Sequence, residues 1–317
     1  MNRLGTAFLC SLLAGCAARA PHPDAFAFGV MGDIPYTEDE ERVFPELLKR
    51  TDAEALAFVI HVGDFKRERD ECSDSVYAQR KAQFDSSAHP LIFTPGDNDW
   101  TDCQRPKIGP RDPIERLARL RQVFFANRQS LGRSPIETAA QDACLEPPAA
   151  GCGCGAHPEN RQWTRGAVRF VTLNIPGSDN NVGIDRANDE EARCRNEANR
   201  RWLESAVHAT QAADVHALVV VIHANPWVNE RPGVYDDFLQ QMAQAAWRLG
   251  KPILFVHGDT HTYRVDMPFV DAMGYPRARI TRLEPPGSPK IGWVKVTVDR
   301  ADPEMFRFEP RLLALDP

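Results

Sequence analysis

Five segments of this sequence place carboxylates or histidines directly after short apolar runs. In chain order they are Gly32-Asp33, Gly63-Asp64, Gly96-Asp97-Asn98-Asp99, His223, and His257-Gly258-Asp259-Thr260-His261. A single Gly-Asp is an ordinary turn, and a single buried histidine is ordinarily structural. The evidence for a functional site is therefore the ordered set of all five segments. Carboxylates that converge repel one another unless cations lie between them. Carboxylate oxygens with imidazole nitrogens suit divalent ions such as Mn, Fe or Zn, so the set predicts a metal centre.

The elements that must position these side chains alternate between short strands and amphipathic helices. The predicted strands are Phe26–Met31, Leu56–Val62, Pro90–Thr94, Val168–Leu173, Ala217–Ile222, Ile253–Val256, Arg279–Thr281 and Ile291–Val298. The predicted helices are Glu38–Thr51, 112–127, 196–210 and 235–249. This alternation predicts an α/β fold, in which ligands gather beyond the carboxyl ends of the strands. All five polar segments fall at such ends.

One domain is predicted over residues 25–317, with a cysteine-rich insertion at about 130–165 that shows no helical or strand period. Eight cysteines occur in the chain. Six remain when Cys10 and Cys16 of the leader are set aside, so up to three disulfides are expected in an oxidising compartment. The spacing of Cys152-Gly-Cys154 does not match that of a zinc ribbon.

The first residues predict export. An apolar run from Leu4 to Leu13 is too short to span a bilayer and fits the core of a secretory signal. Leu13-Ala14-Gly15-Cys16 resembles a bacterial lipobox, which implies a signal peptide over residues 1–15, lipidation of Cys16 and a tether over 16–24. Ala17 then favours the outer membrane, with the protein facing the periplasm as a lipoprotein of the bacterial cell envelope. An ordinary signal with an unmodified cysteine is the alternative.

Charge excludes one broad class of function. The 38 basic residues against 44 acidic ones give a formal net charge of −6. General nucleic-acid binding relies on basic side chains that neutralise phosphates, so that role is not expected. A small phosphorylated substrate is compatible with this charge.

The ordered segments resemble the five motifs of the calcineurin-like metallophosphoesterase superfamily: DxH, GDxx, GNH(D/E), a lone His and GHxH. The set GDIPY, GDNDWTDC and HGDTH is similar to a divergent bacterial branch with a motif set like that of purple acid phosphatases. The resemblance extends from Gly32 to His261 and implies a four-layer αββα sandwich with a two-metal centre at the strand ends. It implies Asp33 and His261 on one metal, Asp64 as the bridging carboxylate and His223 on the other metal.

The chain departs from those motifs at several positions. Pro35 stands where the first motif has histidine; Arg67 stands where purple acid phosphatases have a tyrosine ligand, although Tyr36 is close in sequence. Asp97 occupies the position of the asparagine ligand, and Asn98 occupies the position of the histidine that contacts phosphate. In the fifth motif Asp259 replaces the first histidine. If that stretch is extended, residues 257, 259 and 261 share a side, so either His257 or Asp259 could be the ligand.

The resemblance implies a metal-dependent phosphoester hydrolase in which a hydroxide bridging two divalent ions attacks phosphorus. Four carboxylates favour Mn or Fe over Zn. Asn98 and Asp99 are the catalytic candidates: the Asn98 amide can hydrogen-bond a phosphoryl oxygen, and Asp99 can orient a ligand. Lys66, Arg105 and Arg264 are candidates for binding substrate phosphate, or else surface charges. A degenerate relative that binds metal or phosphate without turnover is the alternative, favoured by Pro35 and Asn98. No pattern names the substrate or the oligomeric state.

Overall fold

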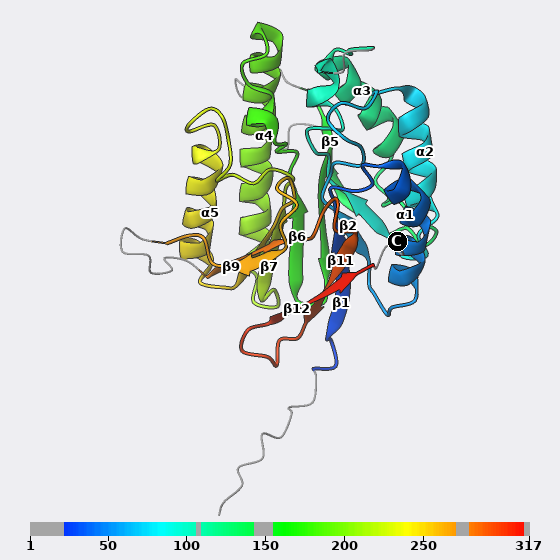
Figure 1. Cartoon of the computed structure of the whole chain (residues 1–317). Helices are drawn as coiled ribbons and strands as arrows, with labels where there is room; N and C mark the ends of the chain where they lie inside the picture. The colour runs from blue at the N-terminus through cyan, green and yellow to red at the C-terminus, as the bar shows by residue number, and fades with distance from the viewer. Residues whose placement is uncertain (1–21, 106–108, 143–154, 271–278, 314–317) are drawn as a thin grey trace, which may run out of the picture.

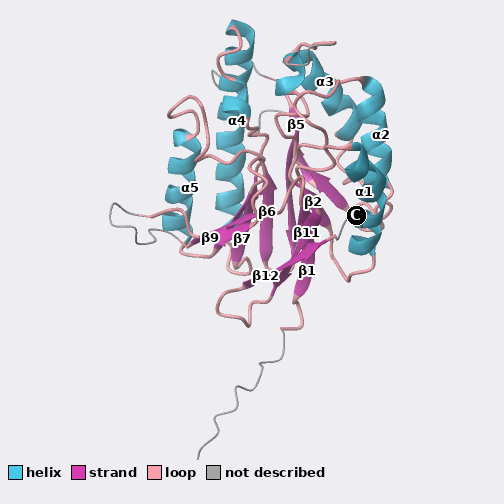
Figure 2. Cartoon of the chain, in the orientation of Figure 1, coloured by secondary structure: helices cyan, strands magenta, loops and turns pink. Residues whose placement is uncertain are grey.

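The computed structural model of this 317-residue chain describes residues 22–105, 109–142, 155–270 and 279–313. Two β-sheets lie face to face, and helices cover the outer face of each sheet (Figure 1; Figure 2). This is the predicted order of layers, helix, sheet, sheet, helix.

The first sheet has five strands in the order β12-β11-β1-β2-β3. Their bounds are β1 (Phe26–Met31), β2 (Val59–His61), β3 (Leu91–Phe93), β11 (Gly292–Val298) and β12 (Phe306–Leu312). Strands β1, β2 and β3 are parallel, so their carboxyl ends share one edge. The helices on this side are α1 (Glu38–Asp52), α2 (Asp74–Asp85) and α3 (Pro113–Phe124).

The second sheet has seven strands in the order β4-β5-β6-β7-β8-β10-β9. Their bounds are β4 (Ala139–Gln141), β5 (His157–Arg165), β6 (Val168–Thr172), β7 (Ala217–Val221), β8 (Ile253–Val256), β9 (Arg264–Asp266) and β10 (Ile280–Glu284). Strands β6, β7, β8 and β10 are parallel. The helices α4 (Arg186–Thr210) and α5 (Asp236–Leu249) cover its outer face.

Each central strand is apolar on both faces because each face is buried. In β1, Phe28 and Val30 join the core between the sheets, whereas Ala27 and Met31 pack with the helices on the outer side. In β7, Val219 and Val221 face the core between the sheets, and Leu218 and Val220 face α4 and α5. This two-sided burial explains why the strands appear in the sequence as continuous apolar runs.

The helix starts follow local capping chemistry. Thr37, Ser73 and Asp112 each accept a hydrogen bond from a backbone N–H in the first turn of α1, α2 or α3, and Pro113 occupies the first position of α3. Helix α4 begins at Arg186, ten residues before the predicted start at 196, because Asp185 caps it. Its first turns bury Asn188 and Arg195 beside polar partners, so they lack the apolar stripe that the prediction required.

The prediction of a loop over about 130–165 is wrong for two stretches, which form β4 and β5. Strand β5 buries Glu159, Asn160, Arg161 and Gln162, so its sequence shows no apolar alternation and gave no strand signal. Residues 143–154 of this segment lie outside the described residues.

A disulfide joins Cys72, just before α2, to Cys103 in the short helix η1 (Thr101–Gln104). Cys194 on α4 is also disulfide-bonded. The predicted signal peptide and Cys16 lie outside the described residues. Within the described ranges, no helix has both the length and the apolar character needed to cross a membrane.

Candidate metal centre

The polar segments meet because parallel strands of both sheets end at the same edge of the sandwich. Asp33, Asp64 and Asp97 follow β1, β2 and β3, while His223 and Asp259 follow β7 and β8. The backbone turns sharply at three of these carboxylates: φ is 56° at Asp33, 58° at Asp64 and 78° at Asp259. This left-handed conformation is rare outside glycine, although aspartate tolerates it better than most residues.

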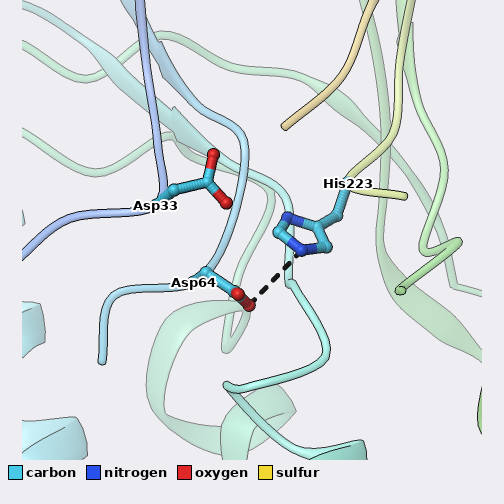
Figure 3. Close-up of side chains that lie close together, drawn as sticks. All are labelled: Asp33, Asp64 and His223. Carbon is cyan, nitrogen blue, oxygen red and sulfur yellow. Dashed lines mark ion pairs between the residues drawn. The ribbon is translucent and has the colours of Figure 1, made fainter. Parts of the chain in front are cut away.

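Asp33, Asp64 and His223 form the first cluster, shown in Figure 3. One ligand atom from each lies within 4.8 Å of the others, and all three residues are buried. His223 Nε2 is 3.4 Å from Asp64 Oδ1, the contact drawn as a dashed line. The two carboxylates come from the five-stranded sheet and the imidazole from the seven-stranded sheet, so the cluster spans the sandwich.

Asp97, His223 and Asp259 form the second cluster, which shares His223 with the first. His223 Nε2 is 2.8 Å from Asp97 Oδ1 and 3.7 Å from Asp259 Oδ1. Despite this proximity, His223 Nε2, Asp97 Oδ1 and Asp33 Oδ2 are buried without a partner in hydrogen-bond geometry. Buried polar atoms are ordinarily satisfied. Unpaired oxygens and a nitrogen aimed at a common space are the donor set that divalent cations require, so these residues fit such ions.

The imidazoles are oriented by their other ring nitrogens. His223 Nδ1 lies 2.7 Å from the carbonyl oxygen of Val62, and His261 Nδ1 lies 2.9 Å from that of Ser288. A carbonyl can only accept, so each Nδ1 carries a proton, and Nε2 is the nitrogen left to face a cation. His261 Nε2 is 3.7 Å from Asp33 Oδ1, which places it beside the first cluster.

The electrostatics of the centre also call for cations. Burial raises the pKa of both Asp33 and Asp259 to about 7. Burial and the charge of Asp97 raise the pKa of Asp64 well above its usual value. Burial opposes the ionisation of Asp97, but its hydrogen bond and charge interaction with His223 lower its pKa to about 2. Burial also opposes the ionisation of His223, but the charges of Asp64 and Asp97 outweigh it and raise its pKa. Without cations, therefore, protons must compensate the negative charge.

The motif glycines permit the close approach of these segments. A Cβ at Gly96 would lie 2.1 Å from Asp64 Oδ1 and 2.8 Å from His223 Cε1. Gly63 has φ +102°, and a Cβ there would lie 2.6 Å from His223 Nδ1. Any side chain at either position would displace a proposed ligand.

Asn98 and Asp99 act on Asp64 in different ways. Asn98 donates through its backbone N–H to Asp64 Oδ1 (2.9 Å) and through Nδ2 to Asp64 Oδ2 (2.6 Å). Asp99 is fully buried and accepts from the backbone N–H groups of Asp64, Phe65 and Gly96 at 2.7–2.9 Å. Asp99 thus fixes the two loops that carry the ligands. Tyr36 OH also donates to Asp64 Oδ2, at 2.8 Å.

The fifth motif is not extended, contrary to the assumption that residues 257, 259 and 261 share a side. Asp259 and His261 have φ of 78° and 55°, so the alternation of side chains is broken. Asp259 joins the second cluster. His257 does not: it packs on the Phe255 ring with centroids 5.4 Å apart.

A cleft of about 630 Å³ opens onto the centre and is lined by Asp64, Asp97, Asn98, Asp259 and His261. Arg105 is among its described lining residues, paired with Glu68 (3.0 Å) and Asp102 (3.1 Å). Lys66 and Arg264 are not. The Lys66 ammonium is buried against the carbonyls of Arg67 and Asp70, and Arg264 pairs with Glu284 at 2.8 Å. Of the three basic candidates, Arg105 alone faces the cleft.

Two site residues carried no motif signal. Ser178 Oγ lies 2.7 Å from Asp97 Oδ2, and the backbone N–H of Asn225 donates to Asp259 Oδ2 at 3.0 Å. Both residues follow strands that end at this edge, β6 and β7. That position is the only sequence signal that could have found them.

The solved structures similar to this chain include a dimetal phosphatase from Danio rerio. It has 12% sequence identity and a TM-score of 0.57, and the match covers 90% of this chain and 96% of that one. The chain has the calcineurin-like metallophosphoesterase fold. At this identity the similarity concerns the fold alone. The resemblance inferred from the five motifs is confirmed at that level.

Two further matches are weaker. A phosphatase from Mycoplasma pneumoniae has 10% identity and a TM-score of 0.42, with 91% of this chain and 93% of that one covered. Vacuolar protein sorting 29 from Cryptosporidium parvum has 11% identity and a TM-score of 0.33, with 92% and 99% covered. No family model and no curated protein sequence match the chain.

Proposed function

We propose that this protein is a metal-dependent phosphoester hydrolase with a two-cation centre. The observation that carries the proposal is the convergence of three buried aspartates, Asp33, Asp64 and Asp97, and the partly buried Asp259 around His223 Nε2. The fold shared with a dimetal phosphatase supports the same activity.

The two clusters would hold one cation each. Asp33 and His261 flank the first position, and Asp97 and Asp259 flank the second. His223 belongs to both clusters, and Asp64 lies beside it in the first. Bound divalent cations would supply Lewis-acid activation of the phosphoryl group and of a water molecule. The protein's own part is to hold the carboxylates in place, through Asn98 and Tyr36 on Asp64, and to exclude bulk water by burial. We propose Mn or Fe rather than Zn, because carboxylate oxygens outnumber nitrogens in the donor set.

The leaving group would receive little help from Asn98. Its amide has no acidic proton, and its Nδ2 donates to Asp64 and to Tyr36 OH (3.0 Å). General acid catalysis is worth roughly 10²–10⁴-fold, so turnover of esters with poor leaving groups should be slow. Small phosphorylated molecules that fit the cleft are the proposed substrates, with Arg105 at its rim.

The test is turnover of bis- and mono-p-nitrophenyl phosphate by the Mn-loaded protein. Asp64→Asn should abolish turnover, whereas Asp39→Asn, an exposed carboxylate on α1, should leave it unchanged. Turnover that survives in Asp64→Asn would refute the proposed site. The ratio of the two rates would rank diesters against monoesters, and metal analysis after loading from an equimolar mixture would overturn the proposed metal preference if Zn dominated.

A non-catalytic role in binding metal or phosphate is the second candidate. It is favoured by one observation: the Asn98 amide is engaged by Asp64 and Tyr36 instead of being directed to substrate. Stoichiometric Mn binding without turnover of either ester would favour this role over hydrolysis.

We also propose that the protein is exported and anchored to the cell envelope through lipid on Cys16. The sequence Leu13-Ala14-Gly15-Cys16 supports this proposal, and the Cys72–Cys103 disulfide is the kind of bond that persists in an oxidising compartment. Mass spectrometry of the mature N-terminus should find a diacylglycerol-modified Cys16. An unmodified mature N-terminus at any other residue would contradict it.

A further inference from the structure

The loop between β6 and α4 contains the most unusual backbone of the described chain. Ser178, Asp179, Asn180 and Asn181 have consecutive φ values of 47°, 52°, 58° and 67°. Asparagine tolerates this left-handed region, but four consecutive residues in it make a strained stretch of backbone. Such a conformation persists only where surrounding contacts enforce it.

Arg195 of α4 holds this turn in place through hydrogen bonds. It is fully buried, donates to Asn180 Oδ1 (2.5 Å) and to the Asn180 carbonyl (3.0 Å), and also donates to the Asn174 carbonyl (2.9 Å). Glu191 holds the other side of the guanidinium at 2.8 Å. Arg195 also lies over the Trp100 ring at 5.2 Å, which connects the turn to the loop of Asp97.

Neighbouring segments secure the rest of the turn. Thr101 Oγ1 donates to Asn181 Oδ1 at 2.7 Å. Asp179 Oδ1 accepts from the backbone N–H groups of Glu230 (2.9 Å) and Arg231 (3.0 Å). The turn is therefore fixed from three directions, by α4, by η1 and by the segment before α5.

The strained turn places the hydroxyl group of Ser178 beside two carboxylates. Ser178 Oγ is 2.7 Å from Asp97 Oδ2 and 3.1 Å from Asp102 Oδ2. A serine hydroxyl has one proton to donate, and Asp102 Oδ2 already faces Arg105 at 3.1 Å. The proton therefore goes to Asp97 Oδ2, in the shorter contact, which leaves Asp97 Oδ1 directed at His223 Nε2.

We propose that Ser178 is a positioning residue that makes Asp97 a ligand through one oxygen. An asparagine at position 97 would need no such help, since only its Oδ1 can ligate a cation and its Nδ2 would itself donate to Ser178 or Asp102. An aspartate has two equivalent oxygens, and the Ser178 hydroxyl makes them inequivalent. The left-handed turn, which Arg195 holds in place, brings that hydroxyl against Asp97. The proposal rests on the metal centre of the proposed function but does not require turnover.

The test is a double-mutant cycle on the dissociation constant for Mn²⁺, measured by calorimetry on the purified protein without substrate. Ser178→Ala should weaken Mn²⁺ binding about 10–100-fold, the usual cost of losing a group that orients a ligand. In the Asp97→Asn background the same Ser178→Ala change should alter the constant less than twofold. Circular dichroism would verify that each variant is folded.

Three results would overturn the proposal. An Mn²⁺ affinity of Ser178→Ala within twofold of wild type would show that the hydroxyl does not act on Asp97. Equal losses in both backgrounds would mean that Ser178 only supports the loop. Absence of Mn²⁺ binding by the wild-type protein would remove the centre itself. If Mn²⁺ binds as expected but no ester is hydrolysed, the proposed function fails and this inference stands.

Discussion

His223 and His257 follow the neighbouring parallel strands β7 and β8, and both are fully buried. Their pKa values nevertheless shift in opposite directions. His223 lies among carboxylates that raise its pKa against the effect of burial. For His257, burial dominates and lowers the pKa to about 3, and the nearby charges of Arg282 and Arg264 act in the same direction.

Side-chain alternation explains the difference. His223 continues the register of Val219 and Val221, whose side chains face the space between the sheets, where the carboxylates of the other sheet meet it. His257 continues the register of Ile253 and Phe255, which face the helices. A histidine directly after a parallel strand, where the alternation still holds, therefore becomes a candidate ligand only when its parity directs it between the sheets.

The largest effect expected from this comparison concerns the ligand itself. His223→Ala should weaken Mn²⁺ binding by more than about 100-fold, since even loss of an outer orienting group costs 10–100-fold. His257→Ala should leave the Mn²⁺ dissociation constant within about threefold. Calorimetric titration of both variants checks the pair, and a comparable loss in both would end the distinction between the two histidines.

A second prediction concerns pH and metal removal. The folded-state pKa of Asp33 and Asp259 is raised to about 7 from 3.8, so their contribution to stability is full below about pH 4 and is lost as pH rises through 7. The raised pKa of His223 acts in the same direction. Asp97, with a pKa of about 2, contributes equally at pH 5 and pH 8.

The metal-free protein should therefore unfold more easily at pH 8 than at pH 5. Excess Mn²⁺ should reverse that order, because cations replace the protons and bind more tightly as the carboxylates ionise. Thermal unfolding with chelator or with Mn²⁺ at both pH values checks this. An unchanged order after Mn²⁺ addition would contradict the placement of cations among these carboxylates.

His257 should produce the third effect, on stability in acid. Its pKa falls from 6.5 to about 3 on folding, so its contribution to stability is lost as pH falls below 6.5. At pH 5 this loss is roughly 2 kcal/mol, at 1.36 kcal/mol per unit. His257→Gln should make the free energy of unfolding less sensitive to pH between 6.5 and 5, as measured by denaturant titration. An identical pH slope in wild type and variant would show that His257 is not a buried neutral imidazole.

His261 should show the smallest effect. Its side chain is 28% exposed and its Nε2 is 3.7 Å from Asp33, so water can replace it more readily than it can replace His223. His261→Asn should weaken Mn²⁺ binding by about tenfold. A loss of affinity as large as that of His223→Ala would show that the exposure of a histidine does not determine how much it contributes to Mn²⁺ binding.

Much of the scaffold was readable from local chemistry. The apolar runs predicted β1 and β8 at their observed bounds, and the Asp112-Pro113 start of α3 follows from capping. Strand β5 was not readable, because its buried face is polar and satisfied by partners far away in sequence, as when Asn160 Nδ2 donates to Asn199 Oδ1 at 2.7 Å. The early turns of α4 were missed because they too bury polar side chains, Asn188 and Arg195.

The sequence by itself determined which residues could bind metal, because the order of Gly-Asp and histidine segments after apolar runs requires only strand ends and residue types. The tertiary structure alone decided between His257 and Asp259, through the left-handed turn at Asp259. It alone showed that Lys66 is turned away from the cleft and that Ser178 reaches Asp97 across 81 residues of sequence. The physical reason is range: strand propensity and capping act between near neighbours, whereas the direction of a ligand and its hydrogen-bond partner depend on packing between two sheets.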